Sequence, residues 1–250
     1  MNFTILRFDS VDSTNTEALK HARRGADEGS CVVARQQTAG RGRQGRTWAS
    51  LMGAGLYLSL VLRPKLEAKF LPLITLAAAV AAYDSLKELG IDPDIKWPND
   101  LLVNEKKICG ILAETTETDR GLAVILGIGV NLTNESIPPD LGASATSIQQ
   151  ELDTQVTIEE LERKLLQQID LWYSRLKESG GPASIIDAWA GRSTYFHGKN
   201  VRVTLTDTSF TGVSDGLETN GALRVKQKNG EIAIIQAGDV ERLRTKEQIN

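Results

Sequence analysis

The segment from residue 94 to residue 128 most constrains the fold, because strand-like runs follow one another there with only short turns between them. Residues 101–103 and 107–114 flank the turn residues Asn104 and Glu105, a pattern that predicts a β-hairpin. Residues 121–128 are mostly apolar and predict the next strand. Consecutive strands with such short connections indicate an antiparallel or mixed sheet.

Further strands and three helices are expected outside this segment. Alternating or continuously apolar residues predict strands at 3–8, 30–37, 56–62 and 94–97. Helices are expected from Ser13 to Gly25, over 70–89 before Gly90, and from the capping box at 157–160 to Glu178. The run Gly180-Gly181-Pro182 then interrupts the last helix.

The residue pattern of the sequence changes near Ser193. After Gly198 it consists of short strands with turn signals at Asp207, Asn220-Gly221 and Asn229-Gly230. About fifty residues of this kind predict a small β-barrel. We therefore expect two units, residues 1–192 and residues 193–250.

Composition excludes several classes of protein. The formal net charge is -3, which argues against a protein that coats nucleic acid, so any basic surface must be local. Two histidines leave little material for a His-rich metal site or a Ser-His-Asp triad. With two cysteines and no secretory leader, the chain is expected to be cytoplasmic, with reduced thiols. The apolar stretch 70–83 is shorter than the roughly 20 residues that span a bilayer, so a buried helix is expected there and no membrane partner.

Residues 40–48, GRGRQGRTW, are the most informative motif, because glycines and arginines alternate there between two predicted strands. Glycine lets backbone N–H groups approach a ligand, and arginine presents forked donors to phosphate or carboxylate oxygens. The arginines should repel one another until an anion arrives, so the loop is expected to be mobile when empty and ordered when bound. A nucleic-acid-binding segment and a plain surface loop are the alternatives.

Residues 96–101, KWPNDL, leave a strand through a Pro-Asn-Asp turn. Lys96 and Asp100 then stand together, a cation for phosphate and a carboxylate able to hold Mg²⁺. Turn chemistry alone explains the same residues without any function, and both interpretations stay open.

Residues 106–114, KKICGILAE, place two lysines beside an apolar strand that contains Gly110. A glycine within a strand often marks the close approach of a ligand or of another backbone. Strict alternation puts Lys107 in phase with Cys109, but both faces of the strand are apolar. The sequence therefore does not decide whether Lys106 or Lys107 points inward. Cys109 itself is expected to be an inert buried thiol.

Residues 127–132, GIGVNL, differ from the dinucleotide-binding pattern GxGxxG, because Leu132 replaces the third glycine and no helix follows. Asn131 could offer its amide to a ligand or simply form a turn. Among the tryptophans, Trp172 and Trp189 are expected in the core, and Trp48 and Trp97 near a pocket.

These motifs, in their order along the chain, closely resemble the biotin protein ligases. The motifs are STN at 13–15, QQTAGRGRQGRTW at 36–48, KWPNDL, KKICGILAE and GIGVNL. The resemblance covers essentially the whole chain. It implies an α/β fold of the α+β type, with a mixed central sheet flanked by helices and a small C-terminal SH3-like β-barrel.

The resemblance also implies the reaction and its participants. Biotin and ATP, with Mg²⁺, would give biotinyl-5′-AMP, which would acylate one lysine of a biotin carboxyl carrier protein. Lys107 and Arg43 would be catalytic. The implied biotin-binding residues are Ser13, Thr14, Asn15, Gln37, Gly40, Arg41, Gly42, Arg43, Lys107 and Gly110. The implied nucleotide-binding residues are Arg41, Arg43, Arg46, Trp48, Lys96, Asn99 and Asn131, with Asp100 as a ligand of Mg²⁺.

Two departures from the family limit what the resemblance implies. Some members carry an N-terminal helix-turn-helix domain, whereas only about a dozen residues precede Ser13 here, so no DNA partner is expected. The C-terminal GDVERLR aligns ambiguously, which leaves open whether Arg242 or Arg244 reaches the nucleotide. A homodimer is also left open.

Two other functions compete with biotin attachment. One is the attachment of lipoate or octanoate by a catalytic domain of the same general architecture. The other is a non-enzymatic RNA-binding protein that would use the arginine-rich loop and the small barrel, with strongly salt-dependent affinity.

Overall fold

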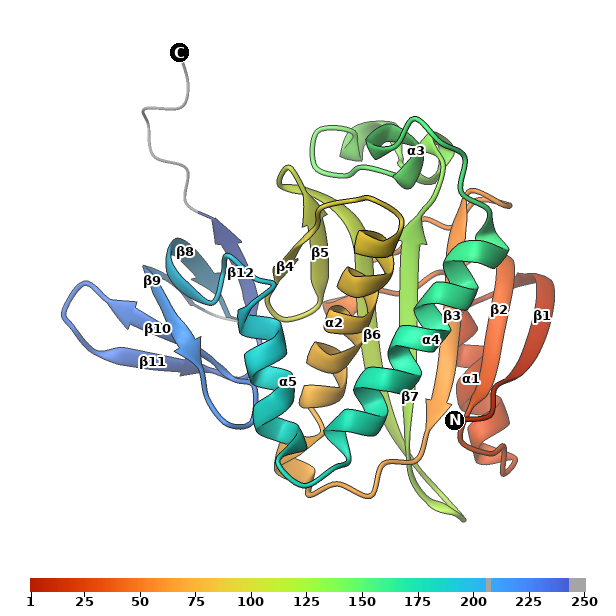
Figure 1. Cartoon of the computed structure of the whole chain (residues 1–250), viewed down its shortest axis with the longest axis horizontal. Coiled ribbons are helices and arrows are strands. Elements are labelled where there is room, and N and C mark those ends of the chain that lie inside the picture. Colours follow the sequence, from red (N-terminus) through yellow and green to blue (C-terminus); the bar gives the residue numbers. More distant parts are fainter. Residues whose placement is uncertain (206–207, 243–250) are drawn as a thin grey trace.

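The computed structural model describes residues 1–205 and 208–242, which form two β-sheets with helices packed on the larger one (Figure 1). The larger sheet has seven strands: β1 (Thr4–Val11), β2 (Ser30–Gln37), β3 (Gly55–Leu62), β4 (Asp94–Lys96), β5 (Asp100–Val103), β6 (Lys106–Thr118) and β7 (Gly121–Asn131). Their order is β1-β2-β3-β7-β6-β5-β4. Only β1 and β2 run parallel. The expected mixed sheet is confirmed.

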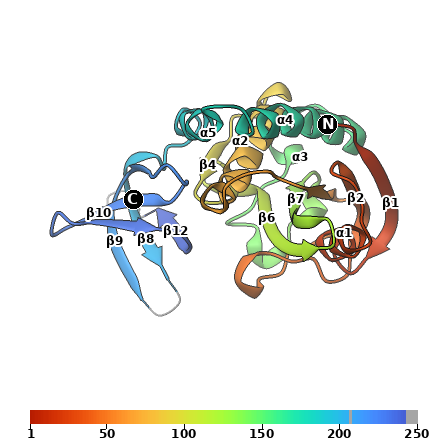
Figure 2. The same ribbon diagram turned by 90° about the horizontal axis from the view of Figure 1, so that it is seen from below.

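Helices cover both faces of this sheet. The helices are α1 (Thr14–Arg23), α2 (Leu73–Glu88), the short α3 (Ile148–Glu151), α4 (Ile158–Leu176) and α5 (Gly181–Ala190). Figure 2 shows α2, α4 and α5 together on one side of the sheet and α1 on the other. The main core lies under α2 and α4, and a smaller apolar cluster lies under α1.

On the face of the sheet that carries α1, β7 has apolar side chains in its first half and glycines in its second half. Ala123 and Ile125 are buried against α1. Because side chains in a strand alternate between faces, Gly127 and Gly129 continue the same face beyond the N-terminus of the helix. On this face β7 is therefore covered by a helix at one end and carries no side chains at the other.

Helix α2 is the core helix that the sequence predicts, although it begins at Leu73 rather than residue 70. By length and composition the segment Ala68–Glu88 could cross a membrane, but 61% of its most apolar window is buried inside the structure. It packs on α4 and α5. Gly90, with φ of 94°, follows its end as expected.

The capping box at the start of α4 is confirmed, since Thr157 Oγ1 accepts a hydrogen bond from the Glu160 N–H at 3.1 Å. The helix ends at Leu176, two residues before the expected Glu178. The sequence analysis did not predict α5, which begins directly after Gly180. A proline fits the first turn of a helix, so the run Gly180-Gly181-Pro182 ends one helix and starts the next.

The smaller sheet contains β8 (His197–Thr204), β9 (Ser209–Leu217), β10 (Leu223–Gln227), β11 (Ile232–Ile235) and β12 (Asp239–Arg242). The strands are antiparallel, in the order β11-β10-β9-β8-β12, as expected for an all-strand unit. The expected turn at Asp207 lies outside the described residues. The indole N–H of Trp97 donates to the Gly221 carbonyl at 3.0 Å and links the two sheets.

Candidate active site

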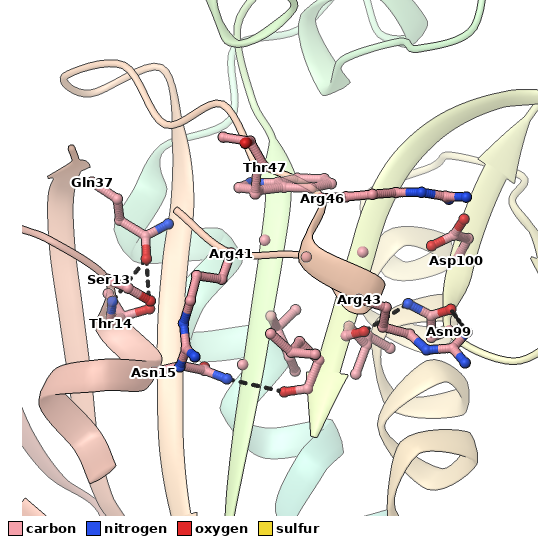
Figure 3. A pocket seen from close by; sticks show the side chains of 18 of the residues that line it. Ser13, Thr14, Asn15, Gln37, Arg41, Arg43, Arg46, Thr47, Asn99 and Asp100 are labelled. Carbon is pink, nitrogen blue, oxygen red and sulfur yellow. Dashed lines mark hydrogen bonds between the residues drawn. The ribbon is translucent and has the colours of Figure 1, made fainter. Parts of the chain in front are cut away.

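A cleft opens on the α1 face of the larger sheet. Three elements meet there: the N-terminus of α1, the loop of residues 38–48, and the bare ends of β6 and β7. Figure 3 shows Ser13, Thr14, Asn15 and Gln37 on one side and Arg43, Arg46, Asn99 and Asp100 on the other. One end of the cleft thus carries hydroxyl and amide side chains with Arg41 beside them, and the other end carries Arg43, Arg46 and Asp100.

Three glycines form the floor of the cleft. Gly110 of β6 and Gly129 of β7 are direct cross-strand partners. A Cβ on Gly129 would lie 2.5 Å from the Trp48 ring, and one on Gly127 would lie 2.1 Å from Asn15 Oδ1. Any other residue type at these positions would displace the side chain above it.

The polar end is a connected group of hydrogen bonds. The backbone N–H of Thr14 donates to Gln37 Oε1 at 2.8 Å, and the Gln37 amide donates to Ser50 Oγ at 2.8 Å. The Asn15 amide donates to the Glu114 carboxylate at 2.8 Å. These side chains are held in fixed orientations and can recognise a small polar ring by hydrogen bonds.

Lys107 points into the charged end of the cleft. Its Nζ lies 2.6 Å from Asp100 Oδ1 and 5.2 Å from the centre of the Trp48 ring. A Cβ on Gly110 would lie 3.1 Å from the same Nζ, so the glycine leaves the lysine its place. Lys106 does not line the cleft.

The expected phase of Lys107 is wrong. Leu101 pairs with Cys109 but Leu102 pairs with Lys107, so Ile108 is an extra residue in β6. A β-bulge of this kind shifts the alternation by one residue. Lys107 therefore shares the cleft face with Gly110, while Cys109 is buried among apolar side chains.

Each arginine of the loop has a protein partner. Arg41 pairs with Glu114 at 2.7 Å, and Arg46 pairs with Asp239 of β12. Arg43 donates to Asn99 Oδ1 at 3.1 Å and to the Gly238 carbonyl at 3.4 Å. The surrounding protein supplies acceptors for all three, although the charge of Arg46 still acts to lower the pKa of the Arg43 guanidinium. The expected mobility of the empty loop stays a prediction.

Arg43 differs from the other two arginines in its environment. Within the described part of the chain it forms no ion pair, and both of its acceptors are uncharged. Burial lowers the pKa of its guanidinium, while the nearby Asp239 and Asp100 carboxylates act to raise it. A half-buried cation without a contacting anion is a favourable place for a phosphate or carboxylate oxygen.

Three of the expected site residues do not line this cleft. Gly40 closes the base of the loop, where its carbonyl accepts from the Trp48 N–H at 2.9 Å. Lys96 is paired in register with Asp100 but does not reach the wall. Asn131 is buried and donates to the Thr146 carbonyl at 2.9 Å. Since the Thr146 N–H donates to the Lys107 carbonyl at 2.9 Å, Asn131 supports the strand that carries Lys107.

The sequence analysis missed several residues of the cleft. Gly127 and Gly129 were visible in GIGVNL, because two glycines spaced by two in a strand leave one face bare. Asp239 had no signal, since it meets Arg46 across 193 positions of sequence. Whether Arg242 or Arg244 reaches the nucleotide stays open, because the structure describes only the backbone of Arg242 and nothing beyond it.

The tryptophans and Cys109 lie where they were expected. Trp48 lines the cleft, and Trp97 lines a second hollow between α2 and the turn at Gly221. Trp172 and Trp189 are buried. Burial raises the pKa of the Cys109 thiol to about 12, so it is not a nucleophile near neutral pH.

The described residues contain no cluster of three His, Cys, Asp or Glu side chains that could hold a metal ion. Asp100 is a single carboxylate, and it is paired with Lys107. Mg²⁺ is commonly held by one or two carboxylates together with the phosphates of a substrate. The single carboxylate of Asp100 therefore fits a Mg²⁺ ion that binds together with a phosphate ligand better than a metal ion held by the protein alone.

Two family comparisons cover most of the chain. Residues 7–131 match the biotin/lipoate A/B protein ligase family, and residues 196–243 match the biotin protein ligase C terminal domain. The first match contains every residue of the cleft named above except Asp239, which lies in the second.

Individual relatives match over nearly the full length. The biotin--[acetyl-CoA-carboxylase] ligase of Paracoccus denitrificans is 39% identical over 92% of this chain and 97% of that protein. The bifunctional ligase/repressor BirA of Bacillus spizizenii is 37% identical over 93% of this chain and 72% of that protein. The structure of a biotin protein ligase from Aquifex aeolicus in complex with biotin and ATP superposes with a TM-score of 0.82 and 29% identity, covering 97% of this chain and 99% of that chain.

Proposed function

The chain belongs to the biotin/lipoate A/B protein ligase family, and on that premise we propose that its cleft uses ATP to join biotin to a lysine of a carboxylase carrier protein. The observation that carries the proposal is the polarity of the cleft. Hydroxyl and amide groups gather at one end, where the cation Arg41 is neutralised by Glu114, and Lys107, Arg43 and Arg46 lie at the other end, over a floor of glycines. Biotin matches that order, because it has a ring with a ureido group at one end and a chain that ends in a carboxylate at the other.

The first step activates the carboxylate of biotin. One carboxylate oxygen attacks the α-phosphorus of ATP, the bond from that phosphorus to the bridging oxygen breaks, and pyrophosphate leaves. We propose that Lys107 bridges the biotin carboxylate and the α-phosphate, where negative charge concentrates in the transition state. Arg43 and Arg46 lie at the same end and can neutralise the leaving phosphates.

In the second step a lysine of the carrier attacks the acyl carbon of biotinyl-5′-AMP. An amide bond forms, the bond to the AMP oxygen breaks, and AMP leaves. The attacking amine must be neutral, and it belongs to the carrier. The cationic Lys107 serves as an electrostatic partner of the leaving phosphate.

The Gly127→Ala variant is expected to bind biotin roughly tenfold more weakly, because the added methyl group overlaps Asn15 Oδ1 and removes about one hydrogen bond from recognition. Isothermal titration with biotin measures this. The control is Gly191→Ala, whose Cβ would meet nothing closer than 3.7 Å and which should bind normally. Equal affinities for the two variants would remove Asn15 from the proposed binding site.

The Asp100→Asn variant is expected to need a severalfold higher Mg²⁺ concentration for adenylation, with a smaller effect on biotin binding, because a carboxylate is the better Mg²⁺ ligand. Pyrophosphate release measured against Mg²⁺ concentration checks this. The control is Asp92→Asn, an exposed carboxylate that pairs with Lys87. Parallel losses in Mg²⁺ response and biotin binding would make Asp100 a residue of the turn or of the Lys107 pair alone.

The competing functions fit the cleft less well. The hydroxyl and amide groups of Thr14, Asn15 and Gln37 suit a ureido ring, whereas the dithiolane ring of lipoate offers them no hydrogen bonds. An RNA-binding loop would present its arginines to solvent. Here Arg41 and Arg46 are exposed but are paired with Glu114 and Asp239, and Arg43 points inward, toward Asn99.

The partner of the enzyme is a carboxylase carrier protein, as the name of the Paracoccus relative implies. We also propose that residues 1–192 and 193–250 are its two units, and that it works in the cytoplasm without DNA or membrane as a partner. Size-exclusion chromatography with light scattering would decide whether it pairs with a second copy.

The direct test incubates the protein with a carrier domain, ATP, Mg²⁺ and biotin, and follows the mass of the carrier. We expect a biotin-sized adduct on one lysine. A parallel reaction with lipoate in place of biotin should leave the carrier unmodified. An adduct with lipoate alone would exclude biotin ligation.

A further inference from the structure

Ser59 is a polar residue in an otherwise apolar strand, and none of the motifs contains it. It lies in the middle of β3, between Leu58 and Leu60, and its exposed fraction is 0%. Its cross-strand partners are Val32 on one side and Gly127 on the other. A buried hydroxyl costs free energy unless it is hydrogen-bonded, so its partners determine what it does.

The hydroxyl of Ser59 contacts two residues of the cleft from behind. Its Oγ lies 2.6 Å from Asn15 Oδ1 and 2.7 Å from Thr14 Oγ1. Both of those residues line the cleft, whereas Ser59 does not. Ser59 therefore has no direct path to a ligand and acts only through Thr14 and Asn15.

The orientation of the Asn15 amide fixes where the Ser59 proton goes. Asn15 Nδ2 donates to Glu114 Oε2 at 2.8 Å and to the Leu112 carbonyl at 3.3 Å, and both of these groups only accept. Asn15 Oδ1 consequently faces Ser59, and an amide oxygen cannot donate. The single proton of Ser59 must lie on its bond to Asn15.

This leaves the bond between Ser59 and Thr14 to the proton of Thr14. Thr14 Oγ1 lies 2.7 Å from Ser59 Oγ and 3.1 Å from Gln37 Oε1, and the Gln37 oxygen already accepts from the Thr14 N–H. Two hydroxyl oxygens 2.7 Å apart need one proton between them, and the Ser59 proton is already directed to Asn15, so Thr14 donates to Ser59 rather than to Gln37. With its proton directed inward, Thr14 Oγ1 presents only lone pairs to the cleft.

We propose that Ser59 is a positioning residue that fixes the Thr14 hydroxyl as a hydrogen-bond acceptor and thereby makes the cleft select a ligand N–H group. The inference rests on the proposed function, since biotin carries two such groups in its ureido ring. In this inference Ser59, which lies behind the binding surface, decides whether Thr14 accepts or donates the hydrogen bond to the ligand. Without Ser59, the Thr14 proton is free to turn to Gln37 Oε1 or to the ligand, and Asn15 Oδ1 loses its donor.

The test measures binding of biotin, and of the two biotins methylated at one ureido nitrogen each, by isothermal titration without ATP. We expect Ser59→Ala to bind biotin roughly tenfold more weakly, the effect of about one hydrogen bond. For at least one methylated analogue the loss should be much smaller, because the N–H that Thr14 accepts is already missing. The preference for biotin over that analogue should therefore shrink, which a double-mutant cycle expresses as a coupling.

Controls separate this role from a general effect on folding. Ser85→Ala removes another buried serine, which donates only to the Ala81 carbonyl within α2, and should leave all three affinities unchanged. Ser59→Cys keeps the shape but has a weak donor and acceptor, so its preference should fall between wild type and Ser59→Ala. It also serves as the folded reference if the alanine variant is unstable.

The outcomes are distinguishable. Equal losses for biotin and both methylated analogues in the Ser59 variants would overturn the inference and leave Ser59 a structural residue. If the wild-type protein does not bind biotin at all, the proposed function fails before the role of Ser59 is tested.

Discussion

Replacing Lys107 with alanine is expected to lower the rate of adenylation by about two to three orders of magnitude, the typical effect of removing one electrostatic stabiliser of a transition state. The side chain is a cation at the charged end of the cleft, 2.6 Å from Asp100 and next to the Trp48 ring. Its loss removes positive charge where the carboxylate attacks the α-phosphate. The measurement is pyrophosphate release with saturating biotin and ATP, together with the circular dichroism spectrum of the variant.

The neighbouring lysine provides the matched control. Lys106 carries the same charge one residue earlier in β6, but it does not line the cleft. Lys106→Ala should retain adenylation within about twofold, as most surface substitutions do. Near-normal pyrophosphate release by Lys107→Ala would contradict the role assigned to it, and equal losses in both variants would point to the general charge of the hairpin.

Arg43→Gly is expected to bind biotinyl-5′-AMP roughly ten- to a hundredfold more weakly and to release it before the carrier arrives, because a charge-assisted hydrogen bond to a buried anion is lost. Arg43 is the loop arginine with only uncharged acceptors, Asn99 Oδ1 and the Gly238 carbonyl, so it has most to gain from an anionic ligand. Escaped adenylate would label exposed lysines of an unrelated protein such as serum albumin, which an avidin blot detects.

Two measurements accompany this variant. Gln44→Gly adds a glycine to the same loop, at a residue that already has a φ of 54°, and removes no charge; it should keep the adenylate bound. Hydrogen exchange of residues 38–48 should slow when biotin and ATP are added to the wild-type protein. Unchanged exchange together with normal retention of the adenylate by Arg43→Gly would show that the loop is not a lid over the reaction.

Local signals in the sequence predicted most elements of the fold. The hairpin at Asn104-Glu105 follows from two turn residues between apolar runs, and both have a positive φ in the structure. The capping box at Thr157 and the glycine after α2 act within a few residues of the chain, so they can be read from the sequence. Helix α5 was missed because Gly180-Gly181-Pro182 was interpreted only as an end, although Ile185 and Trp189 have helical spacing.

The candidate site could be predicted only in part. Residues of the motifs do converge on one cleft, including Thr14, Gln37, Arg43 and Lys107. Which lysine faces inward could not be predicted, because the bulge at Ile108 depends on how β5 and β6 pair. The structure gives no support to a ligand contact by Asn131 either, because its amide N–H groups donate to the backbone carbonyls of Lys107 and Thr146.

The sequence by itself determined helices α1, α2 and α4, the hairpin at Asn104-Glu105, the mixed sheet and the motifs that surround the cleft, because each depends on the chemistry of neighbouring residues. Only the tertiary structure decided the acceptors of the loop arginines, the glycine floor under Asn15 and Trp48, and the contact of Ser59 with Thr14 and Asn15. These contacts join residues from 44 to 195 positions apart. The physical reason is that a side chain has a partner only after strand register and helix packing have placed one within hydrogen-bond distance.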